Sequence, residues 1–228
     1  MNSDIPDQVS DQLAMIKPKL RGWIHAATVP LAVVLGIILL VVSRGAASIT
    51  GAAVFMATSL VLFGVSATYH RFNWSPRIKG IFRRIDHANI FLLIAGTYTP
   101  VSLMLLPSNK ATILLALVWT GALAGVFFRV FWIGAPRALY VVLYVVLGWS
   151  AILFATDLFR ASWITMTLVM IGGVLYSIGA AVYGFKRPNP SPRWFGFHEV
   201  FHTLTVAAFL FQWSGVFVAA IQESHAAG

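Results

Sequence analysis

The sequence predicts an all-α integral membrane protein, a bundle of seven transmembrane helices, and three observations support this fold class. Of the 228 residues, 59% are hydrophobic and only 10% are charged, whereas soluble domains carry about 25% charged residues. Seven apolar runs each approach the roughly 20 residues that a helix needs to cross a bilayer. The connections between these runs are short, which indicates one compact bundle rather than several domains.

The predicted spans cover almost the whole chain. They comprise residues 22–43, 48–70, 87–106, 111–132, 138–156, 163–185 and 198–221. Residues 1–21 form a predicted N-terminal segment, residues 22–221 the transmembrane domain, and residues 222–228 a short tail. The first apolar run is longer than the roughly 7–15 residues of a signal-peptide core, so we expect it to be retained as the first span. Pro100 lies inside the third span and removes a backbone hydrogen bond there, which predicts a kink.

Basic residues are distributed unevenly between the two sides of the predicted bundle. Of the 16 Lys and Arg residues, only Arg44, Lys110 and Arg160 lie on the side that carries the C-terminus. Because loops rich in Lys and Arg stay in the cytoplasm, the N-terminus is predicted to be cytoplasmic and the C-terminus outside. An odd number of spans agrees with termini on opposite sides of the membrane.

The net charge of +9 raises the question of a nucleic-acid partner. The basic residues lie in short loops, which is typical of topology signals, and the chain has no nucleic-acid-binding motif. We therefore expect no nucleic-acid partner, and the sequence identifies no protein partner. There is no cysteine, so disulfides and thiolate ligands are excluded and any zinc ion would need His and carboxylate ligands.

Ionisable side chains gather at the predicted cytoplasmic end of three spans. His70 ends the second span, Asp86 opens the third, and His198 and His202 occupy the first turns of the seventh, while Ser66 lies one turn before His70. Ionisable groups are costly in a bilayer and therefore indicate a functional site. His198 and His202 are four residues apart, which places them on one helix face.

The spacing of these residues predicts a metal site. His198 and His202 can both reach one zinc ion at about 2.0–2.1 Å, with His70 as the third ligand. Three protein nitrogens and one open position are typical of a catalytic zinc. A bound hydroxide and the Asp86 carboxylate would balance the charge of the ion. The alternative is that these histidines are ordinary residues of the membrane interface.

Residues 198–202 also form an H-E-x-x-H sequence, the helix motif of many zinc proteases. In a protease Glu199 would be the general base, but Glu223 and His225 lie at the opposite end of the seventh span and offer no third ligand nearby. The alternative is that Glu199 is a carboxylate at a helix start, favoured by the helix dipole.

The remaining histidines show no partner in the sequence. His25 lies in the opening turns of the first span and His225 in the tail, and we expect both to be incidental. His87, beside Asp86, is expected to face a neighbouring helix or the membrane interface.

Three segments resemble the signature blocks of the hemolysin III group, the bacterial branch of the progestin and adipoQ receptor family. They are Ser66–Phe72, Arg83–His87 running into Gly96–Pro100, and Phe197–His202. The resemblance extends over essentially the whole chain. It implies a multi-pass protein of the plasma membrane, the inner membrane in bacteria, with seven spans and its N-terminus inside.

The resemblance also implies a site. Zinc would be held by His70, His198 and His202, and Asp86 would bind the zinc-bound water. Ser66 would not touch the ion but could hydrogen-bond Asp86 or the water. The wider superfamily includes alkaline ceramidases, so the implied chemistry is hydrolysis of a lipid amide or ester, with a role in membrane lipid homeostasis. The large extramembrane domain of the eukaryotic receptors is missing, so we do not expect hormone reception.

The function predicted first is therefore a zinc-dependent hydrolase that takes a membrane lipid from the inner leaflet and holds its acyl chain inside the bundle. Asp86 and Ser66 would be its catalytic residues. The alternatives are a membrane sensor or regulator with a structural zinc, a pore-forming cytolysin, and an intramembrane metalloprotease. No span shows the polar stripe of a channel lining, which disfavours the pore.

Overall fold

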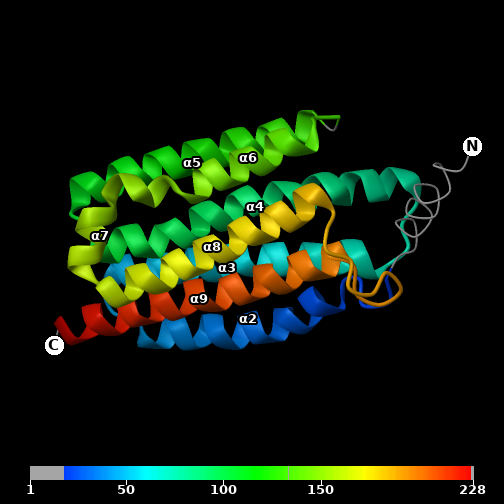
Figure 1. Cartoon of the computed structure of the whole chain (residues 1–228). Coiled ribbons are helices and arrows are strands. Elements are labelled where there is room, and N and C mark those ends of the chain that lie inside the picture. The colour runs from blue at the N-terminus through cyan, green and yellow to red at the C-terminus, as the bar shows by residue number, and fades with distance from the viewer. Residues whose placement is uncertain (1–17, 133, 227–228) are drawn as a thin grey trace, which may run out of the picture.

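The computed structural model describes residues 18–132 and 134–226, and most of this part of the chain is helical (Figure 1). Seven helical segments within it are long and apolar enough to cross a membrane, which confirms the predicted fold class. The elements are α2 (Trp23–Val42), α3 (Gly45–Arg71), α4 (Pro76–Leu105), α5 (Ser108–Phe131), α6 (Arg137–Gly148), the 3₁₀-helix η1 (Ser150–Phe154), α7 (Ala155–Ala161), α8 (Trp163–Phe185) and α9 (Phe197–Ala226). The predicted N-terminal segment lies mostly outside the described residues.

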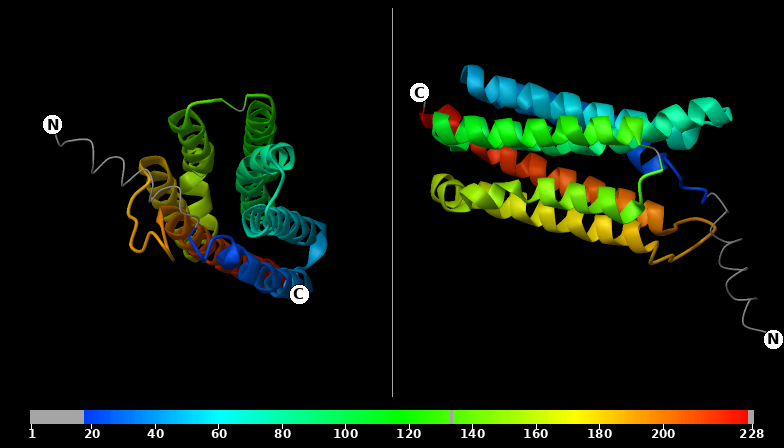
Figure 2. Two further views of the ribbon diagram at one scale, coloured as in Figure 1. Left: turned by 90° about the vertical axis from the view of Figure 1, so that its right-hand side faces the viewer. Right: turned by 90° about the horizontal axis from the view of Figure 1, so that it is seen from above.

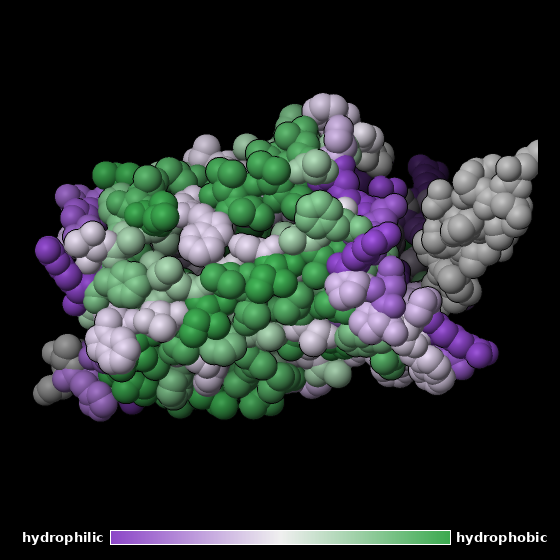
Figure 3. Space-filling view, in the orientation of Figure 1, coloured by the Kyte–Doolittle hydropathy of each residue, from purple (hydrophilic) through white to green (hydrophobic). Residues whose placement is uncertain are grey.

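The helices run lengthwise beside one another in a single bundle (Figures 1 and 2). Helix α2 packs against α3 and α9, α3 against α4, α4 against α5, and α8 against α9. A broad apolar band lies between two polar ends in the space-filling view (Figure 3). Large apolar side chains point outward within the spans, such as Val41, Phe127 and Trp163, which are 67%, 65% and 67% exposed. An outward-facing apolar surface of this kind is what a helix bundle presents to lipid.

Three predicted boundaries differ from the structure. Helix α9 continues to Ala226, so most of the predicted tail, including His225, belongs to the last helix. Helix α4 begins at Pro76 rather than at residue 87, because Pro76 is favoured at the first position of a helix. The charged turns that follow Pro76 are helical and precede the apolar part of α4. The fifth span is also not one continuous α-helix, since η1 separates α6 from α7. The hydroxyl of Tyr98 in α4 donates to the carbonyl of Gly148 and accepts from the N–H of Ala151 at 2.9 Å, which replaces helical bonds at this point.

Helix α4 continues through Pro100 without a break. A Cβ atom on Gly51 of α3 would lie 2.6 Å from the Cα of Pro100, so the two helices approach each other closely at this level. The kink predicted at Pro100 remains a prediction.

The residues just before α2 close one end of the bundle. Lys19 and Leu20 donate backbone hydrogen bonds to Arg193 and Trp194 in the loop between α8 and α9, at 3.1 and 3.3 Å. Gly22 follows with φ 82°, and a Cβ atom there would lie 2.9 Å from the Cβ of His70. This close approach in a left-handed conformation requires glycine. The segment thereby packs directly on the end of α3 that carries the predicted metal ligand His70.

Candidate metal centre

The structure brings the three predicted metal ligands together. His70 comes from the last turn of α3, and His198 and His202 come from the first turns of α9. The Nε2 atoms of His70 and His198 are 3.2 Å apart. One ligand nitrogen from each of the three histidines lies within 4.8 Å of the others. Residues more than 120 positions apart in the chain thus form one cluster.

The geometry of this cluster fits a metal ion. Two nitrogens bound tetrahedrally to one zinc at about 2.0–2.1 Å are about 3.3 Å apart, close to the 3.2 Å between His70 and His198. His202 is 2% exposed and His70 8% exposed, and the Nδ1 atom of His202 has no hydrogen-bond partner in the described structure. Imidazole nitrogens gathered in a buried site could therefore hold a metal ion.

Asp86 lies beside His70, and Ser66 lines the same cavity as Asp86. The Oδ2 atom of Asp86 is 3.8 Å from the Nε2 atom of His70. Ser66, one turn before His70 on α3, faces the Asp86 carboxylate. The carboxylate thus lies next to a helix that also carries one of the ligands.

His25 is part of this site, contrary to the expectation that it is incidental. Its ring stacks on the ring of His202 with centroids 3.8 Å apart and an angle of 11° between the planes. On its other side it meets the edge of Phe63 at 5.1 Å. His25 is 2% exposed. The sequence carries one indication of this position, because His25 lies in the opening turns of a span that starts at the same membrane face.

Glu199 is occupied by structural contacts. Its Oε1 atom pairs with Arg21, and its Oε2 atom accepts a hydrogen bond from the backbone N–H of Gly196 at 2.9 Å. In a capping box, a glutamate at the third position of a helix accepts a hydrogen bond from the N–H of the residue just before the helix. Glu199 and Gly196 form this contact at the start of α9. These contacts agree with the interpretation of Glu199 as a helix-start residue, since each of its oxygens already accepts from a donor of the surrounding structure.

His87 faces neighbouring helices, in line with the expectation from sequence. Its Nδ1 atom lies 3.0 Å from a guanidinium nitrogen of Arg129, and its Nε2 atom lies 3.1 Å from the hydroxyl of Tyr183. Arg129 is one of the basic residues expected in the short loops, but it lies inside α5 and is 1% exposed. A count of basic residues cannot distinguish a solvated loop arginine from one turned into the bundle.

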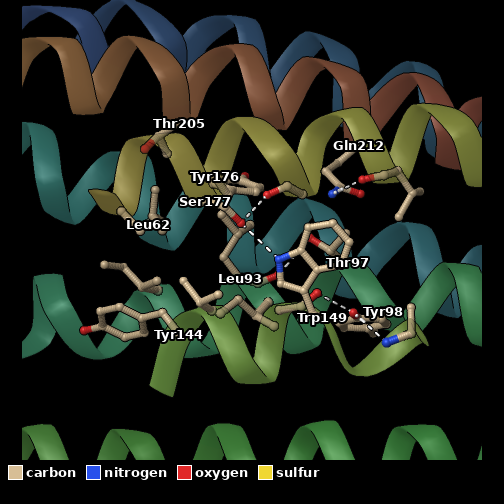
Figure 4. Close-up of a pocket in the computed structure, with 18 of the residues that line it drawn as sticks. Leu62, Leu93, Thr97, Tyr98, Tyr144, Trp149, Tyr176, Ser177, Thr205 and Gln212 are labelled. Atoms are coloured by element: carbon tan, nitrogen blue, oxygen red, sulfur yellow. Dashed lines mark hydrogen bonds between the residues drawn. The ribbon is translucent and has the colours of Figure 1, made fainter. Parts of the chain in front are cut away.

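An apolar cavity of about 230 Å³ runs from the histidines into the bundle. Its walls include His198, His202 and Asp86 at the metal centre. Figure 4 shows the part inside the bundle, with Leu62, Tyr144 and Thr205 toward one end and Tyr98, Trp149 and Gln212 toward the other. Long apolar pockets with a few convergent polar groups are typical of sites for apolar ligands.

Together, the fold and the site define a multi-pass integral membrane protein with a histidine cluster that borders an internal cavity. Residues 13–213 match the family described as "Haemolysin-III related", and the chain belongs to this family. The resemblance to the hemolysin III group is thereby confirmed, and the family's bacterial members are proteins of the inner membrane.

Two relatives show how far the similarity extends. The chain is 31% identical to Hemolysin-3 from Bacillus cereus over 143 residues, which are 62% of this chain and 65% of that protein. It is 35% identical to the Hemolysin-3 homolog from Bacillus subtilis (strain 168) over 135 residues, 59% of this chain and 63% of that protein. The match therefore covers less than two thirds of either relative.

Proposed function

We propose that this protein is a zinc-dependent hydrolase that cleaves an amide or ester bond of a membrane lipid. The observation that carries the proposal is the position of the three imidazoles, which gather beside a carboxylate, while that carboxylate, His198 and His202 line an apolar cavity. A metal site and an apolar cavity that share walls can hold a reacting carbonyl and its acyl chain together.

His70, His198 and His202 would hold the zinc ion, since their nitrogens lie at distances that fit one ion. Zinc bound there would polarise the substrate carbonyl and lower the pKa of water to about 7. The choice of zinc follows from the donor set, because the chain offers imidazole and carboxylate but no thiolate.

Asp86 would transfer the protons of the reaction, and Ser66 would position Asp86. Asp86 lies next to the ligand nitrogens and lines the cavity, so it can accept a proton from the attacking water and deliver it to the leaving amine or alcohol. Ser66 would direct that carboxylate by donating a hydrogen bond to it. The cavity would hold the acyl chain, and the orientation predicted from the basic residues would bring the lipid from the inner leaflet.

Two other functions have some support. A sensor or regulator with a structural metal is supported by the position of the histidines between the ends of α3 and α9, where an ion would fasten two helices together. A cytolysin is supported by the names of the two relatives, and conductance in planar bilayers would test it. The metalloprotease alternative loses support because the Glu199 oxygens are occupied.

The test compares zinc content and lipid hydrolysis in matched variants. His70→Ala and His202→Ala should lose zinc and hydrolysis, while Asp86→Asn should keep zinc and lose hydrolysis by a factor of about 10²–10⁴. His225→Ala removes a histidine from the far end of α9 and serves as the control that changes neither. Wild-type protein that binds no zinc when purified without chelator would refute the proposal, and full hydrolysis in Asp86→Asn would remove Asp86 from the mechanism.

A further inference from the structure

A second polar cluster lies beside the metal centre, and the proposed reaction does not yet use it. It consists of His87 in α4, Arg129 in α5 and Tyr183 in α8. A guanidinium nitrogen of Arg129 lies 3.0 Å from His87 Nδ1, and His87 Nε2 lies 3.1 Å from the Tyr183 hydroxyl. Among the residues that the structure describes, no carboxylate forms an ion pair with Arg129.

The direction of the hydrogen bonds in this cluster is fixed by Arg129. A guanidinium only donates, so His87 Nδ1 must be the acceptor. A neutral imidazole carries one N–H, which therefore lies on Nε2 and donates to the oxygen of Tyr183. The reverse arrangement, with Tyr183 donating to His87, would leave both ring nitrogens without a proton. The hydroxyl proton of Tyr183 is thus free for another acceptor.

Within the described structure, the protein offers the Tyr183 hydroxyl only a distant hydrogen-bond acceptor. This acceptor is the Tyr140 hydroxyl at 3.5 Å, the limit of a hydrogen bond. Tyr183 lines the cavity, and its ring centroid is 5.9 Å from that of the metal-ligand candidate His198. Arg137 contacts Tyr183 twice. Its guanidinium lies 4.8 Å from the centre of the Tyr183 ring and donates a hydrogen bond of 3.3 Å to the Tyr183 backbone carbonyl.

The charge of Arg129 adds to this arrangement. Arg129 is 1% exposed, and its Nε and Nη1 atoms have no hydrogen-bond partner in the described structure. The ring of Tyr140 lies 4.3 Å from the guanidinium carbon and partly stabilises it. A buried positive charge with no counter-ion creates a potential that favours negative charge nearby.

We propose that Tyr183 donates a hydrogen bond to the acyl carbonyl oxygen of a lipid in the cavity, and that Arg129 and His87 are positioning residues that aim this donor. The inference deepens the proposed hydrolase and names its substrate group, an amide or ester carbonyl at the head of an apolar chain. When water attacks the carbonyl carbon, the π bond opens and its electron pair moves to the carbonyl oxygen. A donor already aimed at that oxygen stabilises the charge that develops.

A carbonyl probe that cannot be hydrolysed tests this role without relying on turnover. The probe is 2-heptadecanone labelled with ¹³C at its carbonyl, added to the full-length protein in lipid nanodiscs with its metal in place. The variant is Tyr183→Phe, which removes only the hydroxyl. The matched control is Tyr176→Phe, the same substitution in the same helix and the same cavity, at a phenol whose hydroxyl has no hydrogen-bond partner.

In the wild type we expect the infrared C=O stretch of the bound ketone to be lowered by the hydrogen bond. In Tyr183→Phe the stretch should rise and the affinity should fall about tenfold, the loss expected for one hydrogen bond. Tyr176→Phe should match the wild type, and zinc content should be the same in all three proteins. Should Tyr183→Phe not fold, His87→Phe keeps the phenol but removes the group that aims it, and the stretch should again rise.

The inference is overturned if the wild type does not bind the ketone, if Tyr183→Phe leaves the stretch unchanged, or if Tyr176→Phe changes it equally. Hydrolysis is a separate readout. A protein that hydrolyses no lipid but shows the Tyr183-dependent carbonyl shift would refute the proposed reaction and retain the carbonyl site. A protein that hydrolyses lipid with an unchanged stretch in Tyr183→Phe would retain the reaction and refute this role of Tyr183.

Discussion

Replacing Glu199 by glutamine separates a structural from a catalytic role for the central residue of the H-E-x-x-H sequence. In the structure Glu199 accepts from two donors, the Arg21 side chain and the Gly196 N–H. Glutamine has the same shape but only one acceptor oxygen, so it can satisfy one of these donors and leaves the other unpaired. The Glu199 side chain is 1% exposed and Arg21 is 21% exposed, so water partly solvates the arginine that loses its partner.

The cost follows from these contacts. An unpaired buried donor costs about 1–3 kcal/mol, and the partial solvation of Arg21 reduces this to about 1–2 kcal/mol. For a chain of this size, 1 kcal/mol shifts the melting temperature by about 2–4 °C, so we expect Tm to fall by about 2–8 °C. Zinc content should be unchanged, and hydrolysis measured well below Tm should change little.

The assay is thermal unfolding of the purified full-length protein in detergent, with zinc content and lipid hydrolysis measured on the same samples. Glu223→Gln is the control, because it makes the same substitution at the far end of α9, where no ion pair forms among the described residues. An unchanged Tm together with a loss of hydrolysis of about 10²-fold or more would refute the structural role and make Glu199 the general base.

Three further predictions concern the surroundings of the metal centre. His25→Ala should remove the ring stacked on His202 and weaken zinc binding in a chelator competition, whereas His25→Phe keeps a stacking ring and should bind zinc more tightly than His25→Ala. Gly22→Ala adds a Cβ atom 2.9 Å from His70 in a left-handed conformation, so unfolding measurements should show a loss of about 1–2 kcal/mol; an unchanged Tm would contradict the close packing. Stripping the metal with a chelator should lower Tm and added zinc should restore it, since a ligand that binds only the folded state stabilises it; a Tm insensitive to both would argue against a bound ion.

Much of the candidate site could be predicted from the sequence because the chain is otherwise apolar. In such a background His70, Asp86, His198 and His202 stand out, and their positions at span ends place them at one face of the membrane. The structure agrees with this placement and brings the three imidazoles within ligand distance of one another. The expectation for Glu199 as a helix-start residue also followed from its position alone.

The roles of other residues could not be predicted, because their contacts lie between helices that are distant in the sequence. The partner of His25 is a ring on another helix, and a stacking contact between α2 and α9 has no pattern within either sequence segment. Arg129 lies near a span end, where most arginines reach the interface, and only its burial shows that it turns inward. The break at η1 depends on the Tyr98 hydroxyl, which comes from a different helix.

The sequence by itself determined the membrane class, the seven spans and the end of the bundle where the ionisable groups gather. It could do so because the bilayer sets a fixed length of apolar residues per span and makes every polar exception costly. Only the tertiary structure decided which nitrogens face one another, that His25 supports His202, and that Arg129 orients His87 toward Tyr183. These relations depend on how each helix is rotated about its axis, and helices that are apolar on all sides carry little information about that rotation in their hydrophobic pattern.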